Sequence, residues 1–81
     1  MVPIDARYEG SLHCSARHGP SGSVLATDAP RDNQGLGEAF SPTDLVATAL
    51  ATCVLTTLAI AARKHGLELA DGAHAHVEKV M

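Results

Sequence analysis

The sequence has few aromatic residues, which limits the hydrophobic core that so short a chain can build. Its 81 residues include one Tyr, one Phe and no Trp. Apolar residues make up 46% of the chain, but 14 of them are alanines, which bury little area each. At about 25 cal/mol per Å² of buried apolar surface, such a core contributes little stability. A single domain of this length therefore needs a staple or a partner, and we expect oligomerisation.

Cysteines and basic residues are also few. Two cysteines cannot form a disulfide framework, and the Cys and His spacings do not match a zinc finger. Six Lys and Arg against nine Asp and Glu give a net charge of −3, and the basic residues are scattered. This pattern argues against nucleic-acid binding. Asp5 and Arg7 lead into no apolar run, so we expect no secretory signal and a cytoplasmic protein with reduced thiols.

The N-terminal half alternates between apolar and polar residues with the period of a β-strand. Residues 8–17 place one set of side chains on an apolar face and the other set on a polar face, which predicts a half-buried strand. Residues 18–22 are turn formers, and residues 23–27 resume a strand, so a β-hairpin is predicted. Residues 28–38 then form a surface loop long enough to suggest a role at a site or interface.

The strongest local signals belong to a helix. Ser41 is placed as the N-cap, Pro42 at the first helical position, and Asp44 completes an S-x-x-D capping box. The basic run at residues 63–65 suits the C-terminal dipole, and Gly66 can adopt the left-handed cap. These signals predict a helix that begins at Pro42 and ends just before Gly66.

The predicted helix carries 18 uncharged residues, from Leu45 to Ala62, so a membrane span must be weighed. Its threonines make the segment poorly hydrophobic for a span of about 20 residues, which favours a soluble, buried helix and no membrane partner. Large apolar side chains fall nearly all round the helix, and small residues gather in one strip. One hairpin and a short tail cannot cover such a helix. We therefore expect a second chain to cover it, in a homodimer formed through the central helix.

The C-terminal segment returns to strand periodicity. Asp71 and Gly72 indicate a turn, and residues 73–81 alternate again. The predicted order is β-β-α-β, an α+β fold in a single domain of residues 1–81. Because the chain stops inside this apparent strand, we expect the domain to lack a further C-terminal part of its fold.

Two cysteines are candidates for chemistry. Cys53 lies in the middle of the predicted helix, where a free Cys is either a small buried hydrophobe or a reactive thiolate. It lies about 16 Å from the helix start, beyond the reach of the helix dipole, so a cation or donor from another element must activate it. Cys14 lies on the apolar face of the first strand. It is either a core residue or a resolving thiol for oxidised Cys53.

Three residues of the last predicted strand could offer metal ligands. His74, His76 and Glu78 share one face of that strand. Such pairs are more often an ordinary solvated face, and the sequence identifies no fourth ligand. We therefore expect no metal site and no cofactor, and His13 and His18 are interpreted as exposed residues beside a turn.

A family resemblance rests on the helix and its approach. Phe40-Ser41-Pro42-Thr43-Asp44-Leu45 followed by Ala49-Leu50-Ala51-Thr52-Cys53 resembles the OsmC/Ohr family. Residues 18–22, Thr27-Asp28-Ala29-Pro30 and the glycine-containing loop before Phe40 resemble its OsmC-like branch. The resemblance implies an α+β fold in which two chains intertwine, with sheets around long central helices.

The resemblance also implies a chemistry. Cys53 corresponds to the peroxidatic cysteine of organic-hydroperoxide reductases, which becomes a sulfenic acid and is restored by a dithiol reductant such as lipoamide. Arg17 lies near the position of the family's activating hairpin arginine. The glutamate that orients this arginine corresponds to Thr43 here. A second hypothesis is therefore a non-catalytic dimeric module that binds a small apolar ligand beside Cys53.

Overall fold

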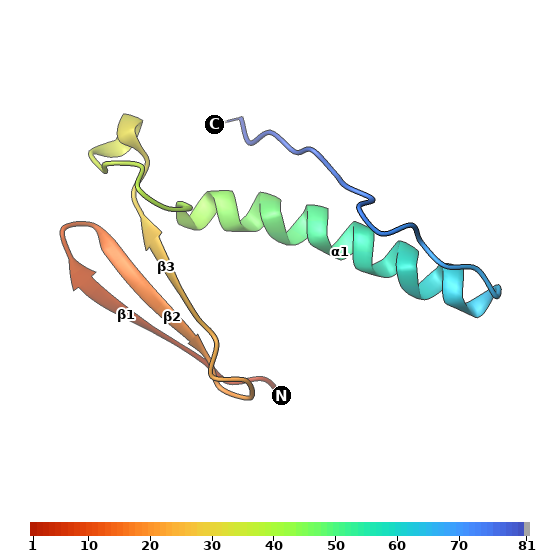
Figure 1. The fold of residues 1–81 in the computed structure, drawn as a ribbon. Helices are drawn as coiled ribbons and strands as arrows, with labels where there is room; N and C mark the ends of the chain where they lie inside the picture. Colours follow the sequence, from red (N-terminus) through yellow and green to blue (C-terminus); the bar gives the residue numbers. More distant parts are fainter. Residues whose placement is uncertain (81) are drawn as a thin grey trace. The chain divides into compact units, whose positions relative to one another are not determined.

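A computed structural model describes residues 1–80 of the protein (Figure 1). Its elements are three strands, a 3₁₀ turn and one long helix, and they follow the chain as β1 (Ile4–Gly10), β2 (His13–His18), β3 (Val24–Asp28), η1 (Arg31–Asn33) and α1 (Pro42–Lys64). The strands form one antiparallel sheet in the order β1-β2-β3. The chain divides into two compact units, Met1–Pro42 and a second that starts at Thr43. The predicted α+β class is confirmed.

The predicted single strand over residues 8–17 was wrong, because the chain reverses in its middle. Ser11 and Leu12 have φ values of 53° and 64°, and they connect β1 to β2. Positive φ at both central residues is typical of the type I′ two-residue hairpin loop, whose backbone twist matches that of the flanking strands. The sequence shows neither Asn-Gly nor Asp-Gly at this turn, so the usual signal for it is missing.

The alternation of apolar and polar residues continues from β1 into β2, across the turn, for a geometric reason. In the register of β1 and β2, Tyr8 lies opposite Cys14, and Ala6 opposite Ala16. Residues directly opposite each other in an antiparallel pair share a face. A register shift between Tyr8 and Gly10 produces this pairing, since Gly10 next to the turn lies opposite His13. From Ile4 to Tyr8 and from Cys14 to His18, even-numbered residues therefore lie on one face of the sheet. The predicted division into an apolar and a polar face holds, although the strand is two strands.

The second hairpin follows the prediction. Residues 19–23 connect β2 to β3, within one residue of the predicted turn at 18–22, and the Gly22 amide donates to the His18 carbonyl at 2.8 Å. The His18 amide donates to the Ser23 carbonyl, also at 2.8 Å. Gly22 has φ of +76°, which glycine adopts without a steric cost. The register runs from Arg17 opposite Val24 to His13 opposite Asp28.

The helix has the bounds that its end signals predict. α1 begins at Pro42 and ends at Lys64, and Gly66 has φ of +72°. The Gly66 amide donates to the Arg63 carbonyl at 3.1 Å, and the Leu67 amide donates to the Ala62 carbonyl at 2.9 Å. This pair of bonds is a Schellman motif, which satisfies carbonyls that the end of a helix otherwise leaves without partners.

None of the residues of α1 is buried within the chain. By length and composition the helix could cross a membrane, a test that the core helices of soluble proteins also pass. Large apolar residues along it are exposed, and they are Val46, Leu50, Val54, Leu58 and Ile60. The apolar surface of α1 is therefore not covered by the described residues. It is the surface that, from the sequence, we expect a second chain to cover.

The segment after α1 contains the predicted turn but not the predicted strand. Gly72 has φ of +86°, and the Ala73 amide donates to the Ala70 carbonyl at 3.1 Å. Residues 73–80 are not a strand; Met81, the last residue of the prediction, lies outside the described residues. Alternation makes a segment suitable for a sheet, but a strand also needs a neighbouring backbone to pair with. No strand within residues 1–80 pairs with this segment.

The C-terminal segment is instead attached to α1 by a side chain. Lys79 Nζ lies 2.8 Å from Asp44 Oδ1 and donates to Thr43 Oγ1 at 3.0 Å. Figure 1 shows the segment running back from the C-terminal end of α1. Lys79 thus contacts the first turn of the helix, although it lies 36 positions from Thr43 in the sequence.

The helix cap gives a first prediction. Gly66→Ala should lower the free energy of unfolding by about 1 kcal/mol, because a left-handed conformation costs a residue with a Cβ roughly that amount. A Cβ at Gly66 meets no atom within 4 Å, so the effect is one of backbone conformation. Gly66→Asn should lose less, since Asn tolerates this conformation. Urea unfolding followed by circular dichroism measures both, and equal stability of the Ala variant and the wild type would contradict the prediction.

Candidate functional site

Cys53 lies in the middle of α1, as predicted, and its thiol is exposed and free of a disulfide bond. Its side-chain neighbour is Thr57, whose hydroxyl oxygen lies 3.9 Å from the sulfur. The two residues are one helical turn apart, so they share a face of α1. Either the Thr57 hydroxyl or the Cys53 thiol can donate the weak hydrogen bond of this contact.

Arg17, the predicted activating residue, belongs to the other unit. It lies on β2, opposite Asp5 of β1 and Val24 of β3. Its guanidinium lies beside the β2–β3 turn, 3.7 Å from the point where a Cβ on Gly22 would stand. Its position in the sheet is therefore set, and its role toward Cys53 stays a prediction.

Cys14 is half-buried on β2, opposite Tyr8 and Thr27. It is a free thiol, like Cys53. Its position on the apolar face of the sheet agrees with the sequence analysis, and its predicted role as a resolving thiol stays a prediction.

Of the three residues near the C-terminus that were weighed as metal ligands, two are in contact with each other. His76 Nε2 lies 3.1 Å from Glu78 Oε1, and both side chains are well exposed. His74 does not join them in a group of metal-ligand geometry within residues 1–80. A single exposed His–Glu contact is an ordinary feature of a solvated segment.

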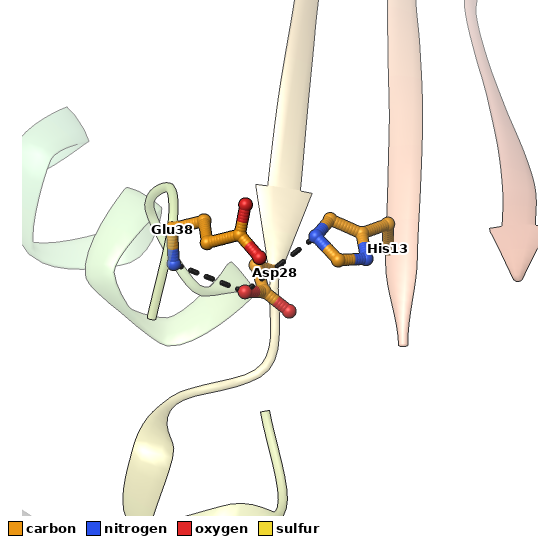
Figure 2. A group of neighbouring side chains, drawn as sticks. All are labelled: His13, Asp28 and Glu38. Carbon is orange, nitrogen blue, oxygen red and sulfur yellow. Dashed lines mark hydrogen bonds and ion pairs between the residues drawn. The ribbon is translucent and has the colours of Figure 1, made fainter. Parts of the chain in front are cut away.

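A polar cluster that the sequence analysis did not predict lies at the end of the sheet. The Asp28 carboxylate lies between His13 and Glu38, and Figure 2 shows these three side chains. Asp28 Oδ2 accepts hydrogen bonds from the Leu36 amide at 3.2 Å and from the Glu38 amide at 3.0 Å. It also lies 3.5 Å from His13 Nε2. Asp28 thus joins β2, the end of β3 and the following loop.

Asp28 is nearly inaccessible to solvent, with 1% of its surface exposed. Its amide donates to the Phe40 carbonyl at 3.1 Å, which closes the loop over residues 29–39. The backbone donor of Glu38 lowers the pKa of the Asp28 carboxyl most strongly, and burial opposes this shift. His13 and the amides of Leu36 and Ala29 lower the pKa further. Asp28 is therefore ionised at neutral pH.

One signal in the sequence could have indicated this cluster. Once the turn of the second hairpin is placed at residues 18–22, counting outward from the Arg17–Val24 pair brings His13 opposite Asp28. The proximity of Glu38 could not be counted in this way. It depends on the path of an irregular loop, which side-chain to backbone bonds determine.

Comparison with known proteins gives two matches. A family model described as OsmC-like protein matches residues 35–81, which include the start of α1 and Cys53. A solved structure from Psychrobacter arcticus 273-4, of a protein named for osmotic stress induction and a detoxification response, is 52% identical with a TM-score of 0.91. The match covers 100% of this chain and 58% of that one, so the chain spans little more than half of that protein's length. No curated protein matches.

The lowered pKa of Asp28 generates a prediction about pH. Its folded-state pKa lies below the ordinary value of 3.8, so the ionised carboxylate contributes stability above that pH. This contribution should be lost as the pH falls below 3.8 through the folded-state pKa. Asp28→Asn should lower stability at neutral pH and flatten the acid limb of a plot of unfolding free energy against pH. Asp32→Asn, at an exposed position of the same loop, is the control and should change neither.

Proposed function

Because the chain belongs to the OsmC-like protein family, we propose that it is a stress-response protein that reduces organic hydroperoxides through Cys53. The observation that carries this proposal is a free thiol in the middle of α1, within the residues that match the family model. An exposed, unbonded sulfur is the requirement for a thiol peroxidase. The relative's name, which refers to a detoxification response, agrees with this assignment.

The reaction begins with the Cys53 thiolate. Its sulfur attacks the distal oxygen of the hydroperoxide, the O–O bond breaks, and the alkoxide leaves as an alcohol after taking up a proton. Cys53 is oxidised to a sulfenic acid, and the peroxide is reduced by two electrons. A thiol then attacks the sulfenic sulfur, releases water and forms a disulfide. A dithiol reductant finally restores the Cys53 thiol and leaves as a cyclic disulfide.

Activation of the thiolate has a local and a distant component. The proposed local donor is Thr57, whose hydroxyl oxygen lies 3.9 Å from the sulfur. The start of α1 is too far away to contribute, since the dipole effect fades within the first turn. We propose that Arg17, or a cation of a second chain, supplies the charge. The resolving thiol is either Cys14 or that of the external dithiol.

We further propose that the protein works as a cytoplasmic homodimer in which the central helix is covered by a second chain. α1 is apolar on all sides and has no buried residue in the single chain. Two of its hydroxyls are satisfied within the helix, since Thr48 Oγ1 donates to the Asp44 carbonyl and Thr52 Oγ1 to the Thr48 carbonyl, both at 2.9 Å. These threonines can therefore face an apolar partner without leaving a donor unpaired.

A second candidate function is supported by the first turn of α1. Thr43, which stands at the position of the family's arginine-orienting glutamate, accepts a hydrogen bond from Lys79 instead. Asp44 also contacts Lys79. If no arginine is held at this position, Cys53 is less activated. The protein is then a dimeric module that binds a small apolar ligand beside Cys53.

Trapping of the sulfenic acid separates the two functions. Treatment of the intact protein with an organic hydroperoxide and a dione reagent should give an adduct at Cys53 in mass spectra. Cys53→Ser should abolish it. Thr57→Val should slow its formation by about two- to tenfold, because a net hydrogen bond contributes about 0.5–1.5 kcal/mol.

Cys14→Ser is the matched control for these measurements. It should retain the adduct, and it should accumulate more of it if Cys14 resolves the sulfenic acid. A folded wild-type protein that forms no adduct at Cys53 would refute the peroxidase and leave the binding module.

The dimer can be tested with one charge on the helix. Leu58→Lys should raise the dissociation constant of the dimer at least tenfold, because burying an unpaired ammonium group costs several kcal/mol and each 1.4 kcal/mol is about tenfold. Leu67→Lys makes the same change beyond the helix, at an exposed residue, and should leave the dimer intact. Sedimentation velocity measures both, and a wild type that is monomeric at every concentration would refute the dimer.

A further inference from the structure

The polar cluster at the end of the sheet contains a buried atom without a partner. Asp28 Oδ1 is inaccessible to solvent and has no hydrogen-bond partner among residues 1–80, whereas Oδ2 of the same carboxylate accepts two backbone amides. An ionised buried oxygen without a donor or a cation is costly. Among residues 1–80, no donor or cation lies within hydrogen-bond distance of this oxygen.

The orientation of His13 leaves its Nε2 facing the same carboxylate. Its Nδ1 lies 2.8 Å from the Ser11 carbonyl, which can only accept, so Nδ1 carries the hydrogen. In the neutral ring, Nε2 then has a lone pair and no hydrogen. This lone pair faces Asp28 Oδ2 at 3.5 Å, so two acceptors oppose each other. A proton or a metal ion must lie between them, and a histidine held through Nδ1–H to a carbonyl is the usual arrangement of a metal ligand.

Glu38 supplies a third ligand atom. The ligand atoms of His13, Asp28 and Glu38 all lie within 4.8 Å of one another. Ligands bound tetrahedrally to zinc at about 2.0–2.1 Å are about 3.3 Å apart, so the His13–Asp28 separation already fits and small side-chain rotations bring Glu38 into range. Glu38 is exposed and His13 is partly exposed, which leaves a route for an ion from solvent.

We propose that His13, Asp28 and Glu38 bind a divalent transition-metal ion of the zinc class. One imidazole and two carboxylates form a ligand set of the type that zinc uses, and three protein ligands leave one position for water. The ion binds His13 Nε2 and the Asp28 carboxylate, so two coordinate bonds replace the acceptor–acceptor contact. Its positive charge also compensates the buried oxygen Oδ1, which has no donor. Because its ligands come from β2, the end of β3 and the loop, binding fixes the loop against the sheet. This site is independent of Cys53 and of the proposed peroxidase.

Equilibrium dialysis of the metal-stripped full chain against zinc tests the proposal. We expect one ion per chain in the wild type and a higher unfolding temperature with zinc than without. Glu38→Gln removes a ligand and keeps the amide that holds Asp28, so it should fold normally. It should weaken zinc binding by more than the roughly 10–100-fold that loss of an outer-shell partner causes. His13→Gln should do the same.

Matched control variants test whether side chains outside the cluster bind the zinc ion. His18→Gln and His76→Gln change histidines outside the cluster, and Glu9→Gln changes a glutamate on the same sheet; each should bind zinc as the wild type does. Substitution with cobalt should give absorption bands of nitrogen and oxygen ligands, without the charge-transfer band of a thiolate. No zinc bound at micromolar concentration, or unchanged binding by a folded Glu38→Gln variant, would overturn the proposal. Loss of binding with His76→Gln or a thiolate band would also overturn it.

Discussion

A long apolar helix without cover within its own chain is the constraint on which the rest of this structure depends. α1 runs for 23 residues, and none of them is buried. No apolar residue among residues 1–80 is buried. Hydrophobic burial is the main favourable term in folding, and the described residues bury little apolar surface by themselves. The second chain of the proposed homodimer would cover the exposed helix and complete the core.

What the N-terminal unit buries instead is polar. Asp28 and Ser41 are the two residues with 1% exposure, and Thr27 follows with 7%. Asp28 occupies a buried position that an apolar residue usually fills. Its carboxylate accepts hydrogen bonds from two amides of the loop and faces His13. Its own amide donates to the Phe40 carbonyl, which joins the two ends of the loop. A buried carboxylate is stabilised only by donors or cations around it, so this loop is organised by electrostatics. The proposed ion would complete that arrangement at the oxygen that has no donor.

Elements formed by short-range interactions were predicted correctly, and elements that depend on long-range contacts were not. The helix was predicted at both ends because Pro42 and Gly66 act on backbone groups a few residues away. The strand over residues 8–17 was wrong because alternation reports the face of a side chain and not the direction of the chain, and the β1–β2 register conserves the face across the turn. The strand predicted from Ala73 onward was wrong because alternation does not supply a neighbouring strand with which to pair. Of the candidate sites, Cys53 was placed correctly on the helix, whereas the Asp28 cluster was missed.

The sequence by itself therefore determined the bounds of the helix and its C-terminal cap, the turns at residues 18–22 and 71–72, the apolar and polar faces of the sheet, and the position of the one helical cysteine. Only the tertiary structure decided that Ser11 and Leu12 reverse the chain, that Lys79 returns to the start of α1, and that Glu38 reaches Asp28. The physical reason is the distance along the chain over which each bond acts. Caps and turns close within about six residues and leave a signature in composition. Contacts such as that between Lys79 and Asp44 depend on the path of the whole intervening chain, for which no short pattern codes.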